Sequence, residues 1–67
     1  MIGYKIEVFY SDEDKGFIAN VPDLKYCSAF GKTAEEAIRE VIIAMNTWLE
    51  AAKANHKPIP KPTPGRA

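Results

Sequence analysis

Apolar residues alternate with polar ones at the start of the chain. Every second residue from Ile2 to Tyr10 is apolar, whereas the residues between them include Lys5 and Glu7. A period of two with β-branched and aromatic residues is typical of a strand that buries one face. The pattern therefore predicts a strand over residues 2–10.

Two shorter apolar segments follow. Phe17–Val21 is the second predicted strand, joined to the first by the polar turn Ser11–Gly16. Pro22 ends this strand because proline donates no ladder hydrogen bond. Tyr26–Phe30 is the third predicted strand, with apolar residues on both faces.

The next segment predicts a long helix. Thr33-Ala34-Glu35-Glu36 fits a capping box, with Thr33 as N-cap and Glu36 at the third helical position. Apolar residues then recur at steps of three, four and one, so the helix should run to about Ala54 with one apolar arc against the core. The residues of this arc are Ala34, Ala37, Ile38, Val41, Ile42, Met45, Trp48, Leu49 and Ala52.

Four alternating prolines, the first of them Pro58, prevent the helix from continuing. Residues 57–67 should be an extended tail that packs on its own domain, stays solvated, or docks into an aromatic groove of a partner. Residues 1–56 should form a single β-β-β-α domain of the α+β class. Its predicted architecture is a three-stranded antiparallel sheet with one long helix packed on a face.

Charge is unevenly distributed along the 67 residues. Nine Lys and Arg balance nine Asp and Glu, which argues against a nucleic-acid coat. Residues 1–50 hold all nine acids and five of the bases, a net charge of −4, whereas residues 51–67 hold four bases and no acid. An acidic body suits a basic partner.

Few residues of the sequence have side chains suited to catalysis or metal binding. Cys27 lies among apolar residues and His56 at the end of the helix, and neither has a catalytic partner in the sequence. The acidic loop has neither the length nor the ligand spacing of an EF-hand. We therefore predict no enzyme activity, no catalytic residue, no cofactor and no metal.

Binding is the better expectation. One helix is too small to bury so many large apolar side chains, so we expect a homo-oligomer, either dimer or tetramer. The first residues lack the basic segment and apolar segment of a signal peptide, and no apolar run is long enough to span a membrane. We therefore expect a cytoplasmic protein. The candidate partner-binding residues are Asp12, Glu13, Asp14 and Asp23 in the loops and Ile43 on the polar arc of the helix.

The order of motifs resembles the HicB-like antitoxin family. The matching segments are Tyr4–Val8, Gly16-Phe17, Val21–Leu24, Cys27, Gly31–Ala37 and Pro58–Pro62. The chain departs from the family's pattern at Lys25-Tyr26, where members often have Pro-Gly. It also stops at Ala67, before the family's DNA-binding segment, so we expect no direct DNA binding.

This resemblance implies a partial ribonuclease-H-like fold without a working ribonuclease site. It also implies that the protein binds and blocks a small basic HicA-type toxin that cleaves mRNA. The alternative is a stand-alone homo-oligomeric scaffold domain with no toxin partner. A nuclease built on Glu7 is a third hypothesis, but that chemistry needs several carboxylates converging on metal ions.

Overall fold

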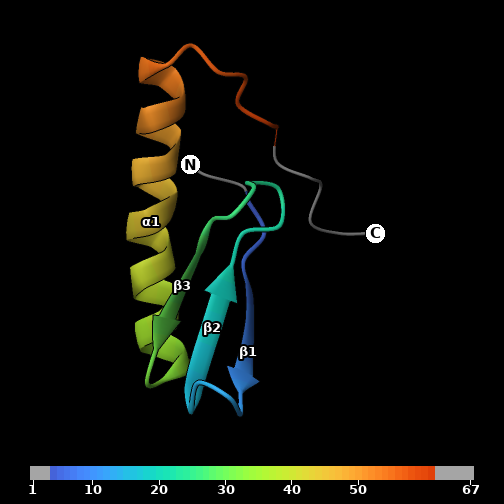
Figure 1. The fold of residues 1–67 in the computed structure, drawn as a ribbon, viewed down its shortest axis with the longest axis vertical. Helices are drawn as coiled ribbons and strands as arrows, with labels where there is room; N and C mark the ends of the chain where they lie inside the picture. The colour runs from blue at the N-terminus through green and yellow to red at the C-terminus, as the bar shows by residue number, and fades with distance from the viewer. Residues whose placement is uncertain (1–3, 62–67) are drawn as a thin grey trace.

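The computed structural model describes residues 4–61. Within this range three strands, β1 (Glu7–Ser11), β2 (Gly16–Asn20) and β3 (Ser28–Gly31), precede one helix, α1 (Ala34–Ala54). The strands form one sheet in the order β1-β2-β3, and both neighbouring pairs are antiparallel. Figure 1 shows α1 lying along one face of this sheet. The predicted α+β architecture is confirmed.

The first strand is shorter than the alternation predicts. Its pairing with β2 begins only where Glu7 lies opposite Asn20, because the chain after Asn20 turns away into the next loop. The alternation itself is right, since Tyr4, Ile6 and Val8 all pack against the core. Residues 2 and 3 of the prediction lie outside the described part of the chain.

The third strand begins at Ser28 rather than Tyr26 because a tight turn precedes it. The Leu24 N–H donates to the Val21 carbonyl at 3.0 Å, and the Cys27 N–H donates to the Leu24 carbonyl at 3.2 Å. Tyr26 sits in the second of these turns with a φ of 61°, a left-handed conformation that ends any extended run. The loop also buries the Leu24 side chain, which is 1% exposed.

The core lies between α1 and the sheet. The helix contributes Ala37, Val41 and Met45 to it, and the sheet and its loop contribute Ala19, Val21, Leu24 and Cys27. The predicted core positions Ile38 and Ile42 are wrong, because these side chains are 38% and 41% exposed. The three-stranded sheet covers only part of the apolar arc, so these two side chains stay exposed to water.

Both ends of α1 are closed by local hydrogen bonds. The Glu36 N–H donates to Thr33 Oγ1 at 3.0 Å, as the capping box predicts, and the Glu36 carboxylate accepts from the Lys32 N–H at 2.7 Å. At the other end, the N–H groups of His56 and Lys57 donate back to the last turn, and His56 adopts a φ of 55°. This is a Schellman motif with histidine where glycine is usual.

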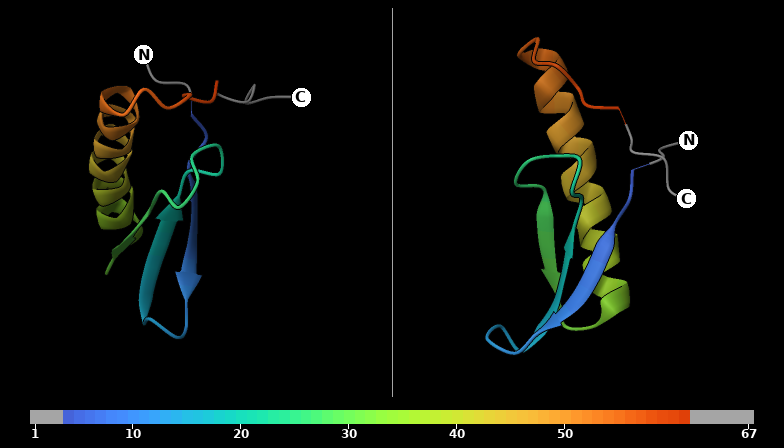
Figure 2. Two further views of the ribbon diagram at one scale, coloured as in Figure 1. Left: turned by 45° about the horizontal axis from the view of Figure 1, so that its top comes forward. Right: turned by 90° about the vertical axis from the view of Figure 1, so that its right-hand side faces the viewer.

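After α1 the chain crosses back over the top of the sheet. Figures 1 and 2 show residues 57–61 running from the helix end towards the start of the chain. The Tyr4 hydroxyl donates a hydrogen bond to the Pro60 carbonyl. This part of the tail therefore packs on its own domain, and residues 62–67 of the predicted tail lie outside the described part of the chain.

Candidate functional site

The acidic hairpin tip, residues 12–14, joins β1 to β2. Ser11 Oγ donates to an Asp14 carboxylate oxygen at 2.9 Å and accepts from the Asp14 N–H at 3.3 Å, which holds the turn together. All three acidic side chains are exposed. The tip is thus an ordered turn that presents three carboxylates to solvent.

The other predicted binding residues lie elsewhere. Asp23 belongs to the β2–β3 loop, at the opposite end of the sheet from the hairpin tip (Figure 1). Ile43 is 56% exposed on α1. The structure therefore brings Asp12, Glu13 and Asp14 together but places Asp23 and Ile43 on separate surfaces.

An apolar row crosses the sheet face that α1 leaves uncovered. Phe9 on β1 pairs with Ile18 on β2, and Ile18 pairs with Phe30 on β3. Ala19 and Val8, the next positions on these strands, face the helix, so the row faces the other way. Phe9 is 52% and Phe30 is 43% exposed. The alternation of residues along the first strand already predicts that Phe9 lies on the opposite face from Val8. Only the pairing register shows that Phe9, Ile18 and Phe30 are neighbours.

A second apolar surface lies on the flank of α1. Ile38 and Ile42 are four residues apart and therefore lie on the same side of the helix. Ile43 lies about 100° further round the helix from Ile42. The sequence pattern assigned Ile38 and Ile42 to the core, so this surface was missed.

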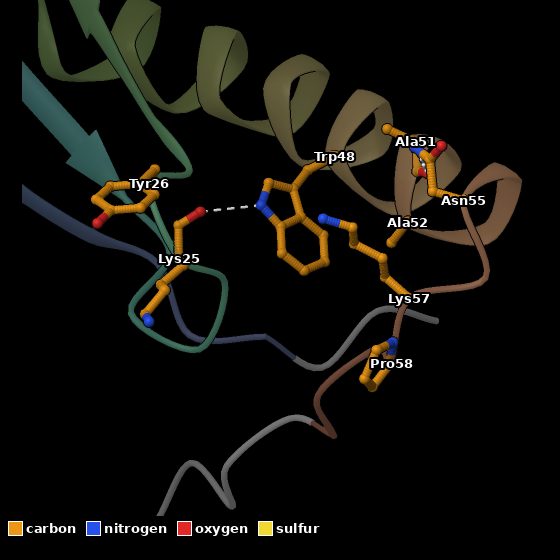
Figure 3. A pocket seen from close by; sticks show the side chains of 8 residues that line it. All are labelled: Lys25, Tyr26, Trp48, Ala51, Ala52, Asn55, Lys57 and Pro58. Atoms are coloured by element: carbon orange, nitrogen blue, oxygen red, sulfur yellow. Dashed lines mark hydrogen bonds between the residues drawn. The ribbon is translucent and has the colours of Figure 1, made fainter.

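A hollow of about 380 Å³ lies between the β2–β3 loop, the second half of α1 and the start of the tail (Figure 3). The Trp48 indole N–H donates to the Lys25 carbonyl at 2.9 Å and so ties the helix to the loop. Besides two helix alanines, the residues that line this hollow are Lys25, Tyr26, Trp48, Asn55, Lys57 and Pro58. No local pattern in the sequence predicts this grouping, because its members come from three separate segments of the chain.

The residues weighed for chemistry in the sequence lie apart from one another in the described part of the chain, and Cys27 is buried. Cys27 is 4% exposed, and burial raises the pKa of its thiol, which keeps it in the unreactive neutral form. Glu7 lies 3.8 Å from the Lys5 ammonium on the surface. Between residues 4 and 61, no three His, Cys, Asp or Glu side chains are grouped to hold a metal ion. No helix in this part of the chain has the length and hydrophobicity to cross a membrane.

Comparison with known proteins gives consistent matches. A family model described as the HicB-like antitoxin of bacterial toxin-antitoxin systems matches residues 4–65. A UPF0150 protein of Synechocystis sp. is 38% identical over 53 residues, covering 79% of this chain and 73% of the relative. A second UPF0150 protein of that organism is 42% identical over 48 residues, covering 72% of this chain but only 61% of the relative.

A UPF0150 protein of Thermoplasma acidophilum is 33% identical over 54 residues, covering 81% of this chain and 78% of the relative. No solved structure matches the chain.

Proposed function

The chain belongs to the HicB-like antitoxin family, and from this membership we propose that it binds and blocks a small basic HicA-type toxin, a protein that cleaves mRNA. Membership supports an antitoxin role in general and suggests a non-enzymatic one. The proposed role places the protein in the cytoplasm, where mRNA is the target. It needs no cofactor and no direct contact with DNA.

The observation that carries the proposal is the exposed row of Phe9, Ile18 and Phe30 on the open sheet face. Two half-exposed phenylalanines flanking an isoleucine supply the apolar centre that protein interfaces need. The row lies close to the acidic hairpin tip, because Phe9 is only three residues before Asp12. An apolar centre with charged groups at its rim is the usual anatomy of a specific interface.

The charges support a basic partner. The hairpin tip carries three carboxylates beside one base, Lys15, and residues 1–50 as a whole carry a net charge of −4. Complementary charge at the rim accelerates encounter and orients the partner more than it tightens the final complex. We therefore propose that the apolar row provides most of the binding affinity and that the hairpin tip increases the rate of association with the partner.

The test measures binding of the purified chain to the small basic protein encoded beside its gene. Phe9→Ala and Phe30→Ala should each weaken binding about 10–30-fold, mainly through faster dissociation. Neutralising the tip with Asp12→Asn, Glu13→Gln and Asp14→Asn should slow association about tenfold at low salt, and the difference should vanish at high salt.

Two controls make the result decisive. Glu50→Gln removes an exposed acid from α1 and should leave association unchanged. Ile43→Ala tests the predicted helix contact, and a loss of binding there with normal binding by Phe9→Ala would contradict the sheet-face assignment. If the neighbouring gene encodes no such protein, or the purified proteins do not bind, the antitoxin proposal fails.

A stand-alone homo-oligomeric domain is the second candidate function. The exposed pair Ile38 and Ile42 supports it, because two copies could bury these side chains against each other. Light scattering should then show a dimer or tetramer, and Ile42→Glu should convert it to monomer without unfolding it. A wild-type chain that stays monomeric at high concentration would exclude this candidate.

A further inference from the structure

The hollow beside Trp48 brings aromatic and basic residues together. It combines two aromatic residues, Trp48 and Tyr26, with two lysines, Lys25 and Lys57, and none of the described residues that line it is acidic. Its volume of about 380 Å³ falls within the range of small-molecule sites in proteins. An apolar, ring-lined hollow with a net charge of +2 favours a flat ligand that carries negative charge.

The indole is held in place before any ligand arrives. Its N–H is already bonded to the Lys25 carbonyl at 2.9 Å, which fixes the ring between the loop and the helix. Figure 3 shows the Lys57 ammonium pointing towards this indole from the helix end. The Lys25 ammonium is turned away in the same view, but its four-carbon chain is flexible enough to swing back.

Tyr26 is the most unusual residue of the hollow. Its side chain is 95% exposed, so it contributes almost nothing to the core. Its φ of 61° is unfavourable for a bulky side chain, and glycine is the residue that such a turn prefers. Unfavourable backbone geometry of this kind clusters at binding sites. Folding alone therefore favours glycine over tyrosine at this position.

Backbone hydrogen bonds at the end of α1 reduce the repulsion that a helix C-terminus exerts on an anion. A helix C-terminus carries partial negative charge on its last carbonyl groups. In this chain the carbonyls of Ala51, Ala52 and Lys53 accept backbone N–H groups from the three residues that follow the helix, Asn55, Lys57 and His56 respectively. The Asn55 side-chain NH₂ also donates to the Ala51 carbonyl at 2.8 Å, which leaves the amide oxygen as an acceptor.

We propose that this hollow binds a nucleotide, with the base against Trp48 and Tyr26 and the phosphate between Lys25 and Lys57. Bases stack on aromatic side chains in a sequence-tolerant way, and lysine pairs with phosphate as a mobile point charge. The nucleotide is either free in solution or the unpaired end of an RNA strand. This inference does not depend on the proposed toxin, because the sheet-face row and the hairpin tip do not line the hollow.

Trp48 is the only tryptophan, so its fluorescence reports on the hollow directly. Titration with adenosine 5′-monophosphate should give a saturable change. Adenosine, which lacks the phosphate, should bind at least fivefold more weakly. Hexaadenylate that binds at least tenfold tighter than the monophosphate would identify an RNA strand as the source, and equal binding would identify the free nucleotide.

Single-residue variants distinguish binding at the hollow from non-specific attraction of the nucleotide to positive charge. Lys57→Gln should weaken binding of the monophosphate at least threefold, whereas Lys32→Gln, the matched loss of one positive charge at the opposite end of α1, should change it less than twofold. Tyr26→Gly should weaken binding at least fivefold while the chain stays folded, and Tyr26→Phe should restore it. The proposal is overturned if no nucleotide gives a saturable change, if both lysine variants behave alike, or if only an acidic peptide binds.

Discussion

Replacing Tyr26 with glycine should stabilise the folded protein. A left-handed conformation costs an L-residue about 1–2 kcal/mol, and glycine avoids that cost. Glycine in turn loses about 0.5–1 kcal/mol more backbone entropy on folding than alanine does. The Tyr26 side chain is 95% exposed, so its removal gives up almost no burial. At the centre of these ranges the difference is a gain of about 0.8 kcal/mol, or about 3–6 °C in Tm for a domain of this size.

The assay is thermal and urea unfolding followed by circular dichroism, at one protein concentration for all variants. Lys25→Gly is the matched control, because Lys25 precedes Tyr26 in the same turn and does not have a positive φ. It should lower the free energy of unfolding by about 0.5–1 kcal/mol, opposite in sign to Tyr26→Gly. A Tyr26→Gly variant that is less stable than wild type would refute the reasoning, because it would mean that the tyrosine ring stabilises the fold.

Three further changes test the packing, the helix start and the buried thiol. Gly31→Ala should cost about 3 kcal/mol or more in urea unfolding, because the added Cβ would lie 2.8 Å from the Ala37 Cα and closer still to its nitrogen, so backbone must move. Thr33→Ala should cost about 1 kcal/mol by the same measurement, because the Glu36 N–H loses its acceptor, and Thr33→Ser should not. Burial raises the pKa of Cys27 above 9.0 in the folded state, so the neutral thiol contributes its full share of the folding stability below pH 9. That share is lost as the pH rises through the pKa of the folded state. In urea unfolding at several alkaline pH values, Cys27→Ala should lose less stability with rising pH than the wild type does.

The sequence by itself determined the elements whose signals are local. The start of α1 follows from Thr33 and Glu36, because a capping box needs only residues three positions apart. The order of three strands and a helix follows from a change in apolar period and from turn residues between the segments. The inward parity of Tyr4, Ile6 and Val8 was also predicted correctly, because alternation within a strand does not depend on its partner.

Strand ends were predicted less well, because they depend on partners distant in sequence. Glu7 marks the start of β1 only because Asn20 is the last residue of β2. Tyr26 has the composition of a strand residue but adopts a turn conformation, which the hydrogen bonds around Leu24 impose. The resemblance to the family shows that this chain has Lys25-Tyr26 where members often have Pro-Gly, but it does not predict the backbone conformation of Tyr26.

The tertiary structure alone decided which residues of the helix's apolar arc remain exposed. Ile38 and Val41 belong to the same predicted arc, yet only Val41 is buried, because the width of the sheet sets how much of the arc is covered. The open row on the sheet needs the register of all three strands, and the hollow joins Lys25 to Trp48 across 23 residues of sequence. Contacts of this range arise from how the elements pack, which no local pattern of residues records.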